Sequence, residues 1–232
     1  MTRDLETRGR LLAAAERMFA DHGFGNVTVR DICRVAHANV AAVNYHFGDK
    51  LGLYREVLQT AIDRIRATNE AAREAGEGRS AEERLRRSIV IFVTRLLRSG
   101  HDTVHRLVQR EIGDPTPALD ALIEQGIRPR IEYLSRCVAD IIGCPPSDPR
   151  VLRCVASIQA QSIAYRPHPI AARLGMPVDA PTAAHVDAIA DHIAEFSLAG
   201  VLAVARSRPR RSRSTMRRSR VRRATSVRRL PG

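Results

Sequence analysis

The sequence lacks any long apolar run, and this absence excludes the simplest kinds of membrane and secreted protein. Uninterrupted apolar stretches, such as Ile89–Val93, stop at five residues, so we expect no transmembrane helix. The first eleven residues contain Arg, Asp and Glu but no apolar segment, so we expect no secretory signal. With 44% hydrophobic and 27% charged residues, the 232-residue chain can still bury a core.

Motifs of metal and enzyme chemistry are also missing. None of the four cysteines forms a Cys-x-x-Cys pair, so we expect free, buried thiols, with a redox pair of Cys137 and Cys144 as the alternative. His101 and His105 have the spacing of two metal ligands on one helix, but no third ligand clearly completes the set. There is no phosphate-binding glycine loop, no Gly-x-Ser-x-Gly elbow and no His-Glu-x-x-His motif. We therefore expect no enzyme activity, no metal and no cofactor.

Lysine is nearly absent, and the basic charge is concentrated in one segment. Lys50 is the only lysine among 38 basic residues. Residues 206–232 contain twelve arginines and no acid, which leaves 26 basic and 25 acidic residues for the other 205 positions. The overall charge of +13 therefore describes this segment, and the rest of the chain is close to neutral.

Alternating strand patterns are nearly absent, whereas apolar residues recur at helical spacing. We therefore expect an all-α fold of about nine helices. The clearest helices cover about residues 6–22, 29–36, 40–46, 149–165 and 183–205. The fourth helix of the chain, which begins after Asp49, carries an apolar stripe from Leu53 to Ile65. Pro129 predicts a kink or break near Gly126 in a long helix that reaches Ile141.

Polar residues mark the expected helix starts. Thr28, Asn39 and Asp49 are predicted N-caps, and Ser80-x-x-Glu83 is a predicted capping box before an apolar, central helix. Residues 67–79 are small and polar, and they predict a fraying helix end and a linker.

Two short helices separated by three residues and followed by a longer apolar helix are typical of a DNA-reading three-helix unit. We expect a helix-turn-helix domain at residues 1–66 and a second helical domain at 67–205. Residues 206–232, rich in Arg and Ser, should form a disordered tail.

Three segments resemble the TetR family of bacterial transcriptional regulators. Residues 11–24 (LLAAAERMFADHGF) resemble the first helix of that family, and residues 27–32 (VTVRDI) resemble the second. Residues 43–54 (VNYHFGDKLGLY) resemble the junction of the recognition helix and the fourth helix. The match covers about residues 5–65.

The second half resembles one subgroup of this family. Arg110-Glu111, residues 115–119 (PTPAL) and Arg128-Pro129 are similar to a CerR-type C-terminal domain, up to about Gly175. The resemblance implies a cytoplasmic homodimeric repressor, associated with the nucleoid when its third helices read palindromic half-sites about 34–36 Å apart on double-stranded DNA. It also implies that the second domain binds an unknown small-molecule effector and dimerises through the last two helices of the body.

The start of a recognition helix should present its side chains to base edges. Here those residues are Asn39, Val40, Ala41, Ala42 and Asn44. Asn44 could pair with adenine, and the alanine methyl groups could contact thymine methyls. The alternative is that Ala41 and Ala42 are simply good helix formers.

The resemblance adds further DNA-contact candidates. Arg30 stands at a family position that often reaches a base and suits guanine, unless it is solvated or paired with an acid. Tyr45 and His46 stand where a hydroxyl or a ring N–H commonly meets phosphate. Lys50 lies in the first turn of the fourth helix, where backbone N–H groups also favour phosphate, so we expect it to contact phosphate. Thr28 is a helix cap, a phosphate donor, or both.

His37 departs from the family pattern, which usually has glycine at this turn. Glycine tolerates a positive φ, whereas histidine does so only at a cost. Either His37 accepts mild strain or the turn differs slightly, which affects the pose of the recognition helix.

The sequence does not identify the effector. Five polar residues are candidates to line its pocket: Arg110, Glu111, Tyr133, Gln161 and Tyr165. The alternative for each of them is ordinary hydrogen bonding between helices.

Two other functions compete with the regulator. A non-specific architectural nucleic-acid-binding protein would depend on the Arg-rich tail, which should bind polyanions in a salt-dependent way. A ligand-binding or interaction protein would have lost operator recognition. The tail itself is a functional segment, a non-functional extension or a frame-shifted reading of GC-rich DNA.

Overall fold

The computed structural model describes residues 2–98, 103–165, 173 and 182–207, with side chains from residue 4 onward. Its helices are α1 (Thr2–Asn26), α2 (Val29–Ala36), α3 (Val40–Phe47), α4 (Lys50–Gly76), α5 (Ala81–Arg98), α6 (Thr103–Gly113), α7 (Leu119–Ala121), the π-helix η1 (Leu122–Ile127), α8 (Arg128–Ile142), α9 (Pro149–Ala164) and α11 (Ala183–Arg206). If α7, η1 and α8 count as one continuous helix, these described segments form nine helices and no strand. The all-α prediction is confirmed. The expected Arg-rich tail lies outside the described residues from position 208 onward.

The predicted caps of the helices are confirmed. In each case a side-chain oxygen accepts a hydrogen bond from a backbone N–H two or three residues later: Thr28 from Asp31, Asn39 from Ala41, Asp49 from Gly52 and Ser80 from Glu83. These bonds satisfy donors that the first turn of a helix leaves without a partner. The starts of α2, α3, α4 and α5 are therefore determined locally.

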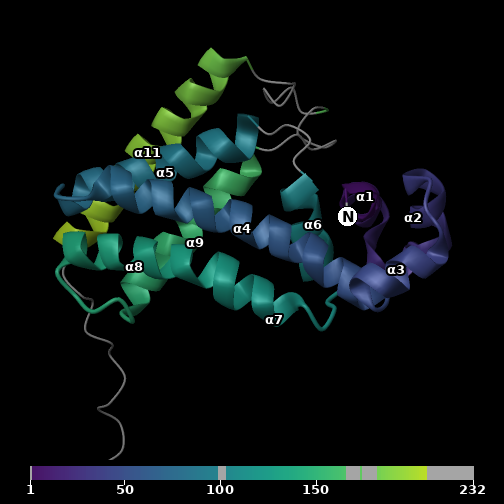
Figure 1. Ribbon diagram of the computed structural model, residues 1–232. Helices are drawn as coiled ribbons and strands as arrows, with labels where there is room; N and C mark the ends of the chain where they lie inside the picture. The colour runs from purple at the N-terminus through teal and green to yellow at the C-terminus, as the bar shows by residue number, and fades with distance from the viewer. Residues whose placement is uncertain (1, 99–102, 166–172, 174–181, 208–232) are drawn as a thin grey trace, which may run out of the picture.

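The helices form two groups that α4 connects. Figure 1 shows α1, α2 and α3 at one end of the molecule, and α5, α8, α9 and α11 at the other, with α4 running between them. In the second group α5 packs against α4, α8 and α11, as expected for a central helix. Its Leu85, Ile89 and Val93 side chains are fully buried.

The predicted kink near Gly126 is present as a π-helix. Pro129 has no N–H to donate to the carbonyl four residues earlier, so the α-helical ladder cannot continue through it. The turn widens instead, and the Arg128 N–H bonds to the Ile123 carbonyl five residues back. The carbonyl of Gly126 accepts a hydrogen bond from the side chain of Asn69 on α4 at 3.0 Å. The kink is thereby fixed against α4.

The predicted fraying segment at residues 67–79 is wrong, because α4 continues without a break to Gly76. Its small residues serve close packing. Asn69, Ala72 and Gly76 are buried, and a Cβ at Gly76 would lie 2.5 Å from the hydroxyl of Tyr133. The sequence signal of small residues indicated a tight contact between helices rather than a linker.

Helix α6 contributes to the core of the first helices, although the sequence assigned it to the second domain. Leu107 is fully buried in the same cluster as Phe19, Tyr54 and Val57, and Val104 joins it. Helix α6 packs mainly against α1 and also against α4. The first three helices and α6 therefore share one hydrophobic core.

Gly52 permits the tight entry into α4. A Cβ at this position would lie 2.0 Å from the backbone oxygen of Phe47, a distance that no packing adjustment of a side chain can relieve. We expect Gly52→Ala to lower the free energy of unfolding by more than about 2 kcal/mol in denaturant titrations. Gly9→Ala is the matched control, because Gly9 is exposed in α1 with nothing within 4 Å of its Cβ position, and it should be neutral or stabilising. Equal effects of the two substitutions would contradict the close approach.

Candidate nucleic-acid interface

The turn between α2 and α3 has the geometry of a left-handed helix end. His37 adopts φ 49° and ψ 50°, a conformation that glycine takes at no cost. The His37 N–H points to the carbonyl of Arg34, and the Ala38 N–H bonds to the carbonyl of Cys33 at 2.9 Å. Of the two alternatives, His37 therefore accepts the strain, and the turn keeps the conformation that a glycine would give it.

Helix α1 holds the two short helices in place. The Arg10 guanidinium donates to the carbonyl of Ala36, the last residue of α2, at 3.1 Å. Arg8 forms an ion pair with Glu56 of α4, and its guanidinium carbon lies 5.2 Å from the centroid of the Phe47 ring. These contacts fix α3 between α1 and α4, since Phe47 ends α3 and Glu56 belongs to α4.

One side of α3 faces solvent. Val43 and Phe47 are buried in the core, whereas the predicted base readers Asn39, Val40, Ala41 and Asn44 are exposed and Ala42 is half-buried. The structure thus brings these predicted residues onto one accessible surface at the start of the helix. Val40 is 40% exposed although it is apolar, which is unfavourable in water and suited to a surface that another molecule covers.

Two of the predicted contact residues, Thr28 and Asn39, use their side chains as helix caps. The Thr28 hydroxyl accepts from the Asp31 N–H and donates to the Asp31 carboxylate at 2.6 Å, so both its functions are used within α2. The side-chain oxygen of Asn39 accepts from the Ala41 N–H at 2.9 Å, which leaves the amide N–H groups of Asn39 as donors. The cap role of Thr28 is confirmed, and its phosphate contact stays a prediction.

The two aromatic candidates on α3 face different ways. Tyr45 is 78% exposed, and its phenol projects from the surface. The His46 side chain is only 7% exposed, and its Nε2 lies 3.3 Å from the Asp4 carboxylate on α1. Tyr45 is available to a ligand as it stands, whereas His46 would first have to leave Asp4.

Arg30 and Lys50 belong to the two helices next to α3 in the chain, α2 and α4. Arg30 is exposed and forms no ion pair among the described residues. The Lys50 ammonium lies 4.3 Å from the centroid of the Phe24 ring, and partial burial lowers its pKa. The aromatic ring holds the ammonium at the start of α4, just after the C-terminal end of α3.

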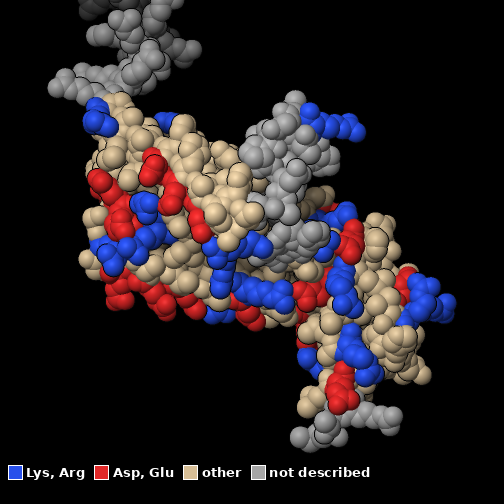
Figure 2. All heavy atoms as spheres, turned by 90° about the horizontal axis from the view of Figure 1, so that it is seen from above, with Lys and Arg blue, Asp and Glu red and all other residues tan. Residues whose placement is uncertain are grey.

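Sequence reasoning missed one exposed cation on the same surface. Arg34 is exposed, one turn after Arg30 on α2, and it pairs with Asp31 at 2.9 Å. The i,i+4 spacing from Arg30 would have indicated a shared face. Figure 2 shows basic side chains over this N-terminal part at the right, with acidic side chains among them as over the rest of the body.

A buried hydrogen bond joins α4 to α6, and thereby ties α6 to the unit of α1, α2, α3 and the start of α4, called the reading unit below. The hydroxyl of Tyr54 donates to the carboxylate of Glu111 at 2.5 Å, and both side chains are at most 1% exposed. The other carboxylate oxygen accepts from the N–H and the hydroxyl of Thr116, each at 2.8 Å. Burial and the Glu111 carboxylate raise the pKa of Tyr54, so the phenol keeps its proton.

The second contact between α6 and the first helix lies at the surface. Arg106 forms an ion pair with Asp21, and Arg110 donates to the Asp21 carbonyl at 2.6 Å. Asp21 stands two residues before Gly23, where φ of 80° breaks the regular course of α1. Helix α6 therefore contacts two helices of the reading unit, α1 through Asp21 and α4 through Tyr54.

The polar candidates for an effector pocket are scattered. Tyr133 lines a small cavity between α4, α5 and α8, and Gln161 lines a separate surface groove between α9 and α11. Arg110 and Glu111 bond within the fold, as the alternative for them expected. Tyr165 is half-buried beside the His192 ring. The structure does not bring these five residues into one site.

The cysteines and the pair of His101 and His105 were the candidates for a redox or metal site. Cys33 and Cys137 are buried, Cys144 and Cys154 are half-buried, and all four are free thiols. His101 lies outside the described residues, so the pair with His105 is not visible. Among the residues that the structure describes, no group of three or more His, Cys, Asp and Glu side chains is arranged to hold a metal ion.

Both halves of the chain match known families. Residues 11–57 match the bacterial regulatory proteins of the tetR family, and residues 81–201 match the C-terminal domain of the HTH-type transcriptional dual regulator CecR. The resemblance is confirmed in both halves, with CecR in place of the name CerR. CecR of Shigella flexneri is 29% identical over 170 residues, which make up 69% of this chain and 76% of that protein.

Solved structures support the same fold. A regulatory protein of the tetR family from Rhodococcus RHA1 has a TM-score of 0.63 and 21% identity, and covers 84% of this chain and 96% of its own. The ketosteroid transcriptional regulator KstR2 of Mycobacterium tuberculosis has a TM-score of 0.59 and 19% identity, with 83% and 93% covered. At these identities the likeness concerns the fold alone.

The hydroxyl of Tyr54 should contribute measurably to stability. Tyr54→Phe leaves one oxygen of the buried Glu111 carboxylate without a donor, so we expect the free energy of unfolding to fall by about 1–3 kcal/mol. Denaturant titrations followed by circular dichroism measure this change. Tyr45→Phe is the control, because it removes the same atom from an exposed side chain and should have no effect. If the two variants unfold alike, the buried bond contributes nothing to stability.

Proposed function

Because the chain belongs to the TetR family of DNA-binding transcriptional regulators and carries a CecR-type C-terminal domain, we propose that it is a homodimeric repressor released from a palindromic operator by a small molecule. The observation that carries this proposal is the accessible face of α3. It offers amide, hydroxyl and methyl groups while contacts from α1 and α4 fix the helix behind it. A rigid helix with small exposed residues suits insertion into a major groove.

The proposed contacts divide into base readout and phosphate positioning. We assign Arg30 and Asn44 to base edges, where guanidinium and amide groups make bidentate contacts with guanine and adenine. Asn39, Val40, Ala41 and Ala42 line the same edge of α3. Tyr45, His46, Lys50 and Thr28 are assigned to phosphates, with Lys50 at the N-terminus of α4.

Dimerisation is proposed through α9 and α11. Phe196 on α11 is 62% exposed, and Leu152 and Ile163 on α9 are 52% and 49% exposed. A groove between the two helices is lined by Phe196 and Val204 among others. By length and composition α11 could cross a membrane. It also carries Asp187 and Asp191, which form ion pairs with Arg98 and Arg86 of α5. An apolar face on a helix held in this way suits a second copy of the chain better than lipid.

In the proposed release, the effector changes the distance between the two α3 helices of the dimer. A ligand that shifts operator occupancy from 99:1 to 1:99 must favour the released state by about 5.5 kcal/mol. Helix α4 spans both groups of helices, so a displacement of its C-terminal half changes the position of its N-terminal half. The Shigella relative is named a dual regulator, and the same displacement of α4 would serve activation as well as repression.

The competing architectural function rests on the Arg-rich tail. Deletion of residues 206–232 separates the two, because an architectural protein loses most of its DNA affinity and a repressor keeps its operator preference. A protein that has lost operator recognition is distinguished by substitutions on α3, which would then change nothing.

Selection of bound sequences from random DNA is the direct test. We expect a variant ending at Ala205 to recover one palindrome at about 0.15 M salt. Recovery of no motif by folded dimer would overturn the proposal. The strained turn at His37, which sets the pose of α3, would then be the first feature to examine.

Three substitutions test the assigned contacts. We expect Arg30→Ala and Asn44→Ala to cost about 1–3 kcal/mol on the operator and to relax specificity, because they remove base contacts. Lys50→Ala should weaken binding about equally on all sequences, because phosphates carry no sequence information. Fluorescence anisotropy on operator and scrambled duplexes measures both effects. Lys50→Met controls for the contact with Phe24, since it keeps an apolar stem without charge. Equal losses on both duplexes for all three positions would remove the base-reading assignments.

The dimer face is tested by charge. We expect Phe196→Glu to convert most of the dimer to monomer in light-scattering measurements, because it places a carboxylate in an apolar contact. Ile112→Glu is the matched control, since Ile112 is 57% exposed but lies on α6. A dimer that survives the first substitution unchanged would place the interface elsewhere.

A further inference from the structure

Arg130 on α8 is a cation without an anion. Three arginines have buried nitrogens that lack a hydrogen-bond partner: Arg84, Arg106 and Arg130. The first two form ion pairs with Asp140 and Asp21. Burial alone lowers the pKa of Arg130 to about 9, with no carboxylate of the described residues close enough to offset it. The group still carries its charge at neutral pH, and an unpaired buried charge is unfavourable.

The two unpartnered nitrogens of Arg130 form one edge of the guanidinium. They are Nε and Nη2, both shielded from solvent although the residue as a whole is half-buried. Together these two groups present parallel N–H bonds, the fork that binds a carboxylate through both of its oxygens. The third nitrogen, Nη1, already donates to the side chain of Gln159 on α9.

The orientation of this fork is fixed before any ligand arrives. The guanidinium carbon lies 3.2 Å from the centroid of the Phe92 ring, so the two planar groups are in contact. Gln159 holds the opposite nitrogen from another helix. A donor pair that is already oriented loses little freedom on binding, which favours affinity.

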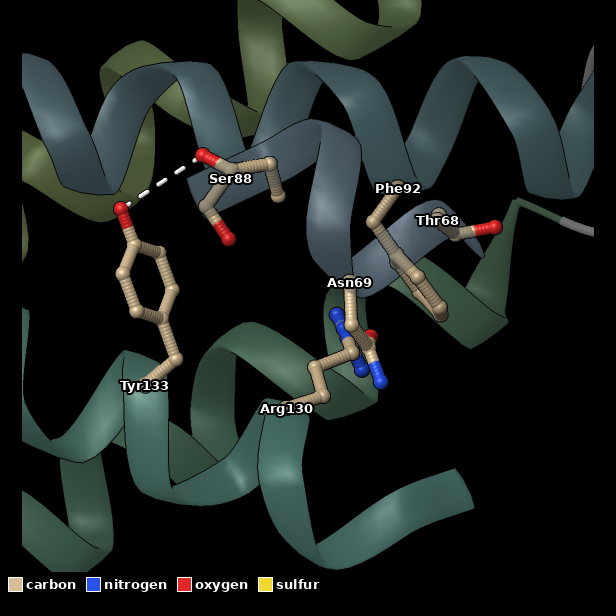
Figure 3. Close-up of a pocket in the computed structure, with 7 residues that line it drawn as sticks. Thr68, Asn69, Ser88, Phe92, Arg130 and Tyr133 are labelled. Carbon is tan, nitrogen blue, oxygen red and sulfur yellow. Dashed lines mark hydrogen bonds between the residues drawn. The ribbon is translucent and has the colours of Figure 1, made fainter. Parts of the chain in front are cut away.

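A cavity adjoins the fork. Arg130, Phe92 and Tyr133 line it together with Asn69 and Ser88, and Figure 3 shows these side chains coming from α4, α5 and α8. Its volume is about 10 Å³, enough for about one water molecule. A larger molecule therefore has to part α4, α5 and α8 as it enters.

We propose that this cavity is the anion-binding end of the effector pocket and that Arg130 recognises the carboxylate of an apolar organic acid. The inference rests on the proposed function, since it names the chemistry of the proposed effector. A carboxylate matches the fork in plane and spacing, and its single charge neutralises that of Arg130. The Phe92 ring and Ala72 provide apolar surface for the rest of the molecule.

The cavity also touches the helix that carries the reading unit. Thr68, Asn69 and Ala72 all belong to α4, and Asn69 bonds to the π-helix through the Gly126 carbonyl. An acid that parts α4 from α8 would strain that bond. Binding at Arg130 thereby acts on α4, whose first residue is Lys50.

The test compares acids with their uncharged counterparts on the full chain. Formate, acetate, benzoate and decanoate are titrated against formamide, acetamide, benzamide and decanamide at one ionic strength set with sodium chloride, and thermal unfolding is followed. We expect at least one acid to raise the Tm while its amide does not. Equal shifts for every acid and amide, or no shift with any acid, would overturn the proposal without recourse to a variant.

Substitutions locate the effect. Arg130→Met removes the charge at similar volume and should lower the affinity for the acid by about tenfold or more, and Arg130→Lys should lower it too because lysine has no fork. Arg128→Met is the control, since Arg128 is exposed on the same helix and pairs with Glu124. It should bind the acid as the wild type does. Undiminished binding by Arg130→Met would overturn the assignment.

Operator binding in the same samples separates this inference from the proposed function. Acid binding that depends on Arg130 supports the site even if the protein selects no palindrome, in which case the repressor proposal fails alone. Acid binding that leaves operator affinity unchanged supports the site and contradicts its role in release. A palindrome selected by a protein that binds no acid contradicts the site alone.

Discussion

The hydrogen bond between Tyr54 and Glu111 is the constraint on which the arrangement of this protein depends. A carboxylate without solvent must be matched by donors, and here Tyr54 from α4 and Thr116 after α6 supply them. The bond can form only when α6 lies on the core of the first helices. It therefore fixes α6 and the segment after it on the core of the first helices, next to the α4 helix that also holds α3.

Two buried side chains, Glu111 and Arg130, differ in how far their hydrogen-bonding groups find partners. Glu111 is fully supplied with donors, which suits a structural joint between helices. Arg130 keeps two donors without acceptors, whereas Arg84 and Arg106, which also have a shielded nitrogen, are paired with acids. A cost of this kind persists where something outside the chain offsets it, which is why the cavity beside Arg130 is the place to expect a ligand.

The elements that sequence reasoning predicted well are those determined within a few residues. The caps at Thr28, Asn39 and Asp49 depend on a side chain and a backbone N–H of the same turn. The kink before Pro129 follows from a missing donor. The segment at 67–76 was misjudged for the same reason: small residues predict a weak helix locally, and only neighbouring helices make them favourable there.

The same distinction between local and tertiary determinants applies to the candidate site. The sequence by itself determined the all-α fold, the family, the two short helices and the set of residues near the start of α3, because periodicity, caps and motifs lie in the chain itself. Only the tertiary structure decided that His46 turns inward to Asp4, that α6 joins the core of the reading unit and that Arg130 has no acid beside it. These facts depend on groups far apart in sequence, and burial and charge pairing are properties of the packed chain rather than of any segment.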